Sequence, residues 1–118
     1  MAHQVDEFRA YRERMNEAIL GAGNLTIGRF FALDTRAYEP GALDVRTKEL
    51  LGLVASTVLR CDDCIRYHLD GCVREGTTDD ELFEAFAVAL VVGGSIVIPH
   101  LRRAVEFLAE LRSAGRES

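Results

Sequence analysis

Two uncharged stretches constrain the fold of this 118-residue chain more than any other feature of its sequence. The first runs from Leu50 to Leu59, and the second runs from Ala85 to Pro99. The second is interrupted by two glycines, and both are too short to span a lipid bilayer. A helix that is apolar on every side is expected to be buried on every side, either in the core of the chain or in a subunit interface.

The other apolar residues recur at helical spacing, and no long stretch alternates with a period of two. We therefore predict an all-α fold in one domain that spans residues 1–118. Asp44 is a typical N-cap residue, Thr78 and Glu81 indicate a capping box, and a short helix is expected to follow Asn24. The six predicted helices cover about residues 5–20, a short segment after residue 24, 44–59, 61–75, 78–92 and 99–111.

The apolar surface of these helices exceeds what a small monomer can hide. A domain of this length has a modest core, which can enclose about one helix that is apolar all round. The surplus predicts a subunit interface, and hence a homo-oligomer. The alternative is a single compact monomer with a deep core.

Charge and cysteine content narrow the class of protein. The net charge is −5 and no basic patch is visible, which argues against nucleic acid or an anionic membrane as a partner. The N-terminal segment has no apolar core of a secretory signal, so we expect a cytoplasmic protein. Three cysteines, an odd number, do not suit a disulfide scaffold in that compartment. A redox or metal-binding role for paired cysteines is favoured instead.

One motif of the sequence has side chains suited to catalysis, and it consists of Cys61, Cys64 and His68. On a helix, residues at i, i+3 and i+7 lie on one face, so these three side chains line up. Two cysteines so spaced at a helix N-terminus can close into a disulfide, and the helix dipole favours their thiolate forms. A histidine one turn beyond the second cysteine can accept or pass on a proton.

Glu49 is the last charged residue before the first apolar stretch, and its helical face carries Gly52, Leu53 and Ser56. A carboxylate on such a face must be partnered or protonated, because an unpaired buried charge is too costly. His68 on a neighbouring helix is a natural partner. Thiolate, imidazole and carboxylate would together form a proton relay.

A zinc site is an alternative interpretation of the same residues. Cys61, Cys64, His68 and Cys72 superficially provide four zinc ligands, but Cys61 and Cys72 lie about 16 Å apart along a continuous helix. Ligands so spread cannot converge on one tetrahedral ion, so we expect no metal site. Cys72 is interpreted as a small buried apolar residue, and His100, near a helix start, as structural.

With these residues in view, the chain resembles the AhpD-like branch of the carboxymuconolactone decarboxylase family. That branch is marked by a glutamate, an eleven-residue gap and then C-x-x-C-x-x-x-H, which Glu49, Cys61, Cys64 and His68 match without an insertion. The resemblance covers about residues 25–105. The chain differs at Asp63, because the best-known peroxidases of the branch have a histidine between the cysteines.

The resemblance implies an all-helical fold that assembles as a homotrimer or homohexamer. It also implies an alkylhydroperoxidase or disulfide reductase in which Cys64 attacks the hydroperoxide and Cys61 resolves the product. His68 and Glu49 relay the proton in that scheme, and an external dithiol, such as a lipoyl or thioredoxin-like protein, regenerates the enzyme. No bound cofactor is required.

The residues alone give the same assignment of the two cysteines. The helix dipole favours Cys61 as the thiolate by about 0.3 to 1 kcal/mol. General-base assistance by His68 to Cys64 contributes about 10²- to 10⁴-fold, which is the larger effect. Two rival functions stay open: a decarboxylase-like enzyme that uses Glu49 and His68 for acid–base chemistry, and a non-enzymatic redox sensor or assembly subunit.

Overall fold

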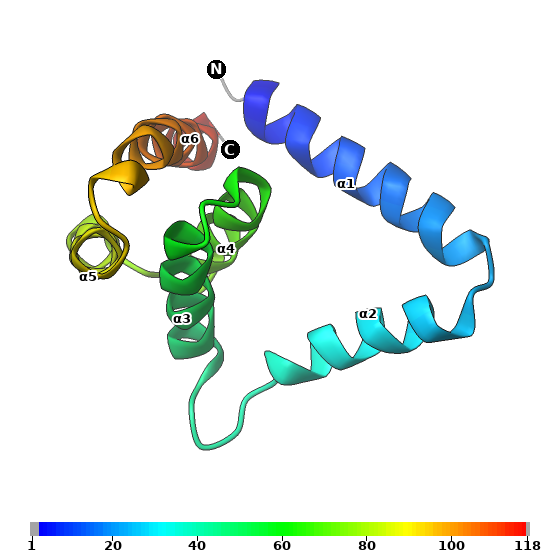
Figure 1. Ribbon diagram of the computed structural model, residues 1–118. Helices are drawn as coiled ribbons and strands as arrows, with labels where there is room; N and C mark the ends of the chain where they lie inside the picture. Colours follow the sequence, from blue (N-terminus) through cyan, green and yellow to red (C-terminus); the bar gives the residue numbers. More distant parts are fainter. Residues whose placement is uncertain (1–2, 118) are drawn as a thin grey trace.

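The computed structural model describes residues 3–117, and it is helical throughout (Figure 1). Six α-helices and one 3₁₀ helix follow one another as α1 (His3–Gly21), α2 (Leu25–Ala37), α3 (Val45–Val58), α4 (Asp62–Arg74), α5 (Asp79–Gly93), η1 (Ser95–Val97) and α6 (Ile98–Glu117). No strand occurs among the described residues. The predicted all-α class and the six predicted helices are confirmed.

The helix starts follow from short side chains that cap free backbone N–H groups. Asn24 accepts a hydrogen bond from the backbone of Ile27 at 3.0 Å, and Asp44 accepts one from Thr47 at 2.8 Å. Thr78 and Glu81 form the predicted capping box at the start of α5. These caps satisfy donors that a helix N-terminus leaves unpaired, which is why the sequence located these starts well.

The turn between α3 and α4 places the two helices side by side. Arg60 adopts a left-handed backbone conformation with a φ of 60°. The N–H of Cys61 then donates to the carbonyl of Ser56 at 3.1 Å, and the N–H of Arg60 donates to the carbonyl of Thr57 at 3.1 Å. This is a Schellman motif, which usually contains glycine at the position of Arg60. The predicted break at Arg60 is confirmed, and it brings Cys61 directly to the N-terminus of α4.

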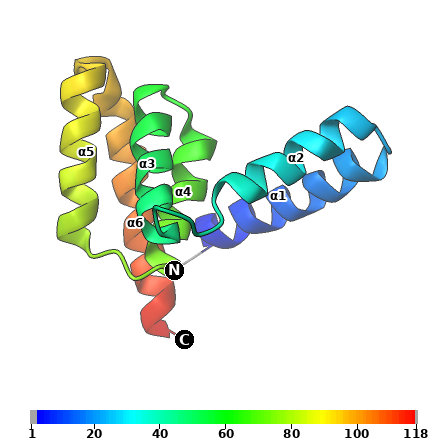
Figure 2. The same cartoon turned by 90° about the horizontal axis from the view of Figure 1, so that it is seen from below.

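The core lies within a bundle of α3, α4, α5 and α6, against which the first turns of α1 also pack (Figures 1 and 2). α3 packs on α4 and α5, and α4 packs on α6. The buried cluster draws residues from all five helices: Val5, Leu53, Ile65, Leu69, Cys72, Leu82, Phe86, Ala104, Phe107, Leu108 and Leu111. α4 is therefore a central element of the bundle, and it carries the cysteine motif.

The first two helices project from this bundle as an open V (Figures 1 and 2). α1 is anchored by Phe8, which packs edge-on against Phe107 with ring centroids 5.5 Å apart. It is also anchored by Arg9, whose guanidinium bonds the buried carboxylate of Asp70 at 2.7 and 2.9 Å. Beyond these contacts the apolar stripe of α1 is exposed, and α2 contains no buried residue.

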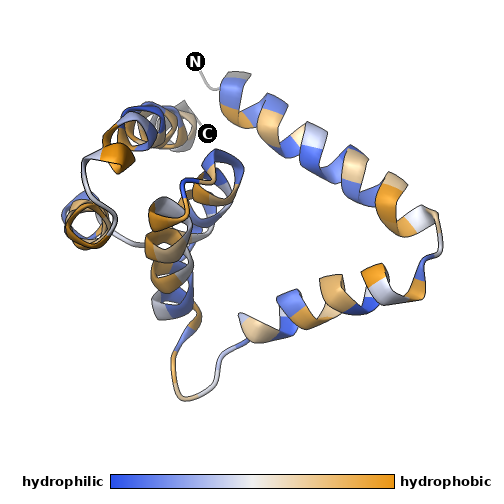
Figure 3. Cartoon of the chain, viewed as in Figure 1, coloured by the Kyte–Doolittle hydropathy of each residue, from blue (hydrophilic) through white to orange (hydrophobic). Residues whose placement is uncertain are grey.

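The two uncharged stretches are not buried on every side within the single chain, which leaves the surplus of apolar surface that the sequence led us to expect. Side chains on the outer faces of α3 and α5 remain exposed: Leu51 55%, Leu59 76%, Val88 55%, Val91 84% and Val92 67%. Figure 3 shows how much of both helices is hydrophobic. A bundle of this size covers only the inner face of each helix. No helix in the described part of the chain is long and apolar enough to cross a membrane.

Candidate functional site

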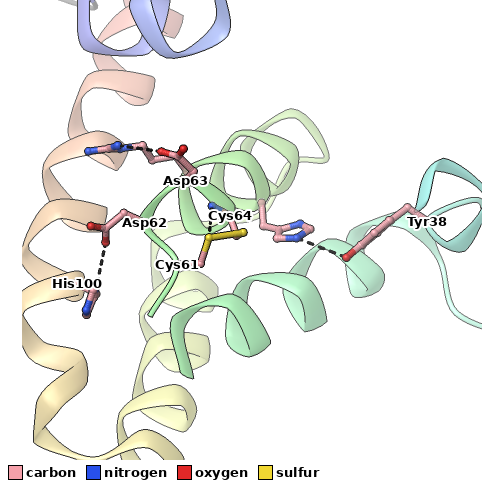
Figure 4. Close-up of a disulfide and its surroundings, with 8 residues drawn as sticks. Tyr38, Cys61, Asp62, Asp63, Cys64 and His100 are labelled. Carbon is pink, nitrogen blue, oxygen red and sulfur yellow. Dashed lines mark hydrogen bonds and ion pairs between the residues drawn. A yellow bond between two sulfur atoms is a disulfide. The ribbon is translucent and has the colours of Figure 1, made fainter. Parts of the chain in front are cut away.

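The cysteine motif forms the first turn of α4 (Figure 4). Cys61 is the N-cap residue, and its sulfur accepts the backbone N–H of Cys64 at 3.3 Å. The two cysteines are disulfide-bonded, with their Cα atoms 5.3 Å apart. Cys64 is exposed, whereas Cys61 is partly covered. The pair is thus accessible, and it lies where the helix dipole stabilises negative charge on sulfur.

Glu49 and His68 form a buried pair between α3 and α4. Oε1 of Glu49 lies 2.8 Å from Nδ1 of His68, and each residue is only 8% exposed. The cost of burying an unpaired carboxylate led us to expect these two side chains to meet, and the structure brings them together. A carboxylate that accepts the Nδ1 proton orients the imidazole and leaves Nε2 available for acid–base chemistry.

Two glycines make room for this pair, one on each helix. A Cβ atom on Gly52 of α3 would lie 2.6 to 2.8 Å from three ring atoms of His68. A Cβ atom on Gly71 of α4 would lie 2.6 to 2.9 Å from the carboxyl group of Glu49. Each glycine follows one member of the pair by three residues and faces the other member. The close approach of α3 and α4 therefore depends on glycine at both positions.

A cavity of about 220 Å³ opens beside the cysteines. It is lined by Arg12, Asp34, Asp63, Cys64, Tyr67 and His68. The guanidinium of Arg12 lies 3.9 Å above the ring of Tyr67, so α1 supplies one wall. The exposed cysteine and the imidazole thus share one solvent-accessible space, as a proton transfer between them requires.

Two acidic residues separate the cysteines, and each has a cationic neighbour (Figure 4). Asp62 bonds Nδ1 of His100 at 2.7 Å and Nε of Arg103 at 2.9 Å. Burial alone would raise the pKa of Asp62, but these hydrogen bonds and charges outweigh it and hold that pKa below its usual value. Asp63 lies 3.6 Å from Arg66. His100, interpreted from sequence as structural, thus links α6 to the residue beside Cys61.

Cys72 behaves as the sequence predicted, as a buried member of the core. Burial, followed by the charge of Glu49, raises the pKa of its thiol to about 12. We therefore expect Cys72 to resist alkylation in the native protein at about pH 8, where its thiol stays protonated. Mass mapping should find a reversible Cys61–Cys64 disulfide and an unmodified Cys72.

The control is the same alkylation in denaturant, which should modify Cys72 fully. Modification of native Cys72 as fast as reduced Cys64, or a disulfide that includes Cys72, would contradict this prediction.

Sequence reasoning missed three residues around this site. Tyr38 approaches His68 from the end of α2, Arg12 comes from α1, and Gly71 faces Glu49. The sequence does indicate Gly71, because this residue follows His68 by three positions and so lies on the same helical face. It does not indicate Tyr38 or Arg12, since the loop after α2 and the packing of α1 depend on tertiary contacts.

Residues 27–107 of the chain match the model of the carboxymuconolactone decarboxylase family. That match covers more than half of the chain and includes all four residues of the predicted site. The chain belongs to the carboxymuconolactone decarboxylase family. The family resemblance inferred from sequence is therefore confirmed.

Solved structures of this family share the fold described above. TM1620 of Thermotoga maritima is 63% identical, with a TM-score of 0.93 over 95% of this chain and 98% of that protein. One description of TM1620 names a candidate involvement in an antioxidative response. The family protein lpg0406 of Legionella pneumophila is 28% identical, with a TM-score of 0.66 over 92% of this chain and 90% of that protein.

A sequence relative from Paracoccus denitrificans is known as uncharacterized protein 4 in the cox locus. It is 35% identical over 85 residues, which cover 72% of this chain and 77% of the relative.

Proposed function

We propose that this chain is a thiol-dependent peroxidase of the AhpD-like branch, which reduces hydroperoxides through Cys64 and Cys61. The thiolate of Cys64 attacks the O–O bond, so that an S–O bond forms and the alkoxide or hydroxide leaves and takes up a proton. The sulfur of Cys61 then attacks the resulting sulfenic acid, which forms the disulfide and releases water. An external dithiol, such as a lipoyl or thioredoxin-like protein, restores both thiols and is itself oxidised.

One observation carries this proposal. The exposed Cys64 shares a cavity with His68, whose Nδ1 is bound to the buried Glu49 at 2.8 Å. This arrangement supports removal of the thiol proton by the imidazole while the carboxylate stabilises the imidazolium that forms. An isolated disulfide without a buried acid–base pair would favour a structural role instead.

The surroundings of the two cysteines support their separate roles. Cys64 is the more exposed residue, and it lines the cavity through which a peroxide can approach. Cys61 is partly covered and is held by the N–H of Cys64 at 3.3 Å, close to the sulfur it must attack. A covered resolving cysteine beside an exposed attacking cysteine favours disulfide formation over further oxidation of the sulfenic acid.

Peroxide consumption, assayed with a panel of dithiol donors, tests the proposal. We expect turnover of an organic hydroperoxide with at least one donor of the dihydrolipoyl or thioredoxin class. Cys64→Ser should abolish it, whereas Cys72→Ser, the matched control, should leave it unchanged. Equal turnover by Cys64→Ser and the parent protein would overturn the proposal.

A second candidate function is supported by a different observation. The Glu49–His68 pair is complete without either cysteine, so it could serve acid–base chemistry on a small molecule, as the family name suggests. The Cys61→Ser/Cys64→Ser double variant separates the two functions. If that variant keeps full turnover of a carboxylated substrate, the acid–base function is favoured. If the variant only loses peroxide turnover, the peroxidase function is favoured.

We also propose that the exposed faces of α3 and α5 lie in the interface of a homotrimer or homohexamer, in a cytoplasmic protein. Sedimentation velocity at micromolar concentration should give three or six times the chain mass of 13.1 kDa. Val91→Lys should lower that mass because it places a charge on the apolar face. Glu75→Lys, an exposed polar position at the end of α4 and outside the two proposed faces, is the control. A parent mass near 13.1 kDa would refute the prediction.

A further inference from the structure

Tyr38 is the residue directly after α2, and it points toward α4 and the cysteine pair (Figure 4). Its hydroxyl lies 3.4 Å from Nε2 of His68, and the two rings are 5.3 Å apart between centroids. Glu49 and Tyr38 therefore contact different ring nitrogens of the same imidazole. Among residues 4–115 these are the two hydrogen-bond partners of the His68 ring.

The backbone around Tyr38 is held by Lys48. Nζ of Lys48 donates to the carbonyl of Ala37 at 3.0 Å and to the carbonyl of Glu39 at 2.6 Å. These carbonyls flank Tyr38 in the chain. Lys48 also precedes Glu49 in α3, so one turn of α3 positions both groups that contact His68. Lys48 therefore holds the backbone on both sides of Tyr38.

The hydrogen-bond roles follow from the chemistry of a neutral imidazole. When Nδ1 donates its proton to the Glu49 carboxylate, Nε2 carries the one free lone pair of the ring. The Tyr38 hydroxyl is then the donor. Burial, followed by the charges of Asp34 and Glu49, raises the pKa of Tyr38, which keeps that hydroxyl protonated.

A single lone pair cannot accept two protons at once. In the disulfide form Cys64 has no thiol proton to offer, and Tyr38 occupies Nε2. We propose that Tyr38 is a positioning residue that holds Nε2 of His68 in the disulfide form and yields it to the Cys64 thiol after reduction. The hydroxyl then favours the oxidised form, because its hydrogen bond is made there and lost on reduction. This inference rests on the proposed function, in which His68 serves Cys64.

The other groups around His68 do not offer the same contact. Arg12, Asp34 and Asp63 line the shared cavity, and Tyr67 packs edge-on against the imidazole at 5.2 Å between centroids. The Tyr67 hydroxyl makes no hydrogen bond to the ring within the described part of the chain. Tyr67 is therefore a matched control, since it has the same ring type at the same distance without the hydroxyl contact.

The test is the thiol–disulfide equilibrium of the whole protein against a mixture of reduced and oxidised dithiothreitol. In this exchange dithiothreitol gives two electrons and two protons to the Cys61–Cys64 disulfide and becomes a cyclic disulfide. Tyr38→Phe keeps the ring and removes only the hydroxyl. It should shift the equilibrium toward the reduced protein by about 2-fold, the lower end of the range for one hydrogen bond, because the 3.4 Å contact is long.

Three further variants show whether the effect passes through His68. Tyr67→Phe should leave the equilibrium where it is in the parent. Lys48→Met should shift it in the same direction as Tyr38→Phe, and should add nothing once Tyr38→Phe is present. In a His68→Gln background Tyr38→Phe should have no effect, which a merely structural role of Tyr38 would not predict.

An unshifted equilibrium in Tyr38→Phe, an equal shift in Tyr67→Phe, or a full shift in the His68→Gln background would each overturn the inference. No peroxide is present in this experiment, so its failure is distinct from failure of the proposed function. The expected shift in a protein that consumes no peroxide would support the role of Tyr38 and overturn the peroxidase proposal alone.

Discussion

Replacing Glu49 or His68 with glutamine is expected to slow the reaction of Cys64 with a hydroperoxide by about 10²- to 10⁴-fold. His68→Gln removes the base itself. Glu49→Gln removes the carboxylate that orients the imidazole from 2.8 Å. Because the two residues act as one unit, the double variant should be little slower than the slower single variant. Stopped-flow measurement of the second-order rate constant of the reduced protein checks this prediction.

Glu75→Gln is the matched control, because Glu75 is an exposed glutamate at the end of α4. Its rate constant should equal that of the parent protein. Effects of Glu49→Gln and His68→Gln that multiply in the double variant would contradict a shared relay. Rate constants within threefold of the parent, about 0.6 kcal/mol in barrier height, would contradict a role in the attack itself.

Replacing Gly71 with alanine is expected to lower the free energy of unfolding by about 1 to 3 kcal/mol and to slow peroxide reduction strongly. The added Cβ atom would lie 2.6 Å from the carboxyl carbon of Glu49, so the carboxylate or the helix must move. Gly52→Ala should act in the same way through His68, whose ring would lie 2.6 to 2.8 Å from the new atom. Urea unfolding and the peroxide rate constant measure the two effects.

Gly28, at the end of the first turn of α2, provides the control, because nothing lies within 4 Å of a Cβ atom at that position. Gly28→Ala should leave activity unchanged and should stabilise the protein slightly, because alanine suits a helix interior better than glycine. Equal stability and activity of Gly71→Ala and Gly28→Ala would mean that α3 and α4 are not held close by glycine.

Much of the fold could be predicted because its helix boundaries depend on local chemistry. The predicted caps at Asp44 and Thr78 need only a short side chain and a nearby backbone N–H, and both form. A cap also forms at Asn24, where only the helix that follows was predicted. The break at Arg60 was predicted as well, although its left-handed backbone is unusual for a residue other than glycine. Local signals of this kind are readable from sequence alone.

Burial was predicted less well, because it depends on which helices meet. The apolar stripe of α1 was expected on an amphipathic helix, yet Tyr11 is 53% exposed in the single chain. The uncharged stretches of α3 and α5 face solvent on one side for the same reason. Periodicity shows that a helix has an apolar face, but it does not show which element covers that face.

The Glu49–His68 pair could be anticipated because an apolar helical face makes a lone carboxylate seek a partner. Tyr38 could not, because its position depends on the loop that Lys48 holds by two backbone carbonyls. No periodicity in the sequence encodes that contact. The candidate site was thus predictable where its residues share regular helices, and unpredictable where an irregular segment delivers a side chain.

The most direct test of the proposed mechanism is to trap the sulfenic acid on the attacking cysteine. Cys61→Ser, treated with one equivalent of hydroperoxide and a dimedone-type probe, should be labelled on Cys64, because the resolving thiol is absent. Cys64→Ser should consume no peroxide and should carry no label on Cys61. Labelling of Cys61 in Cys64→Ser, together with near-normal peroxide consumption, would show that the roles of the two cysteines are reversed.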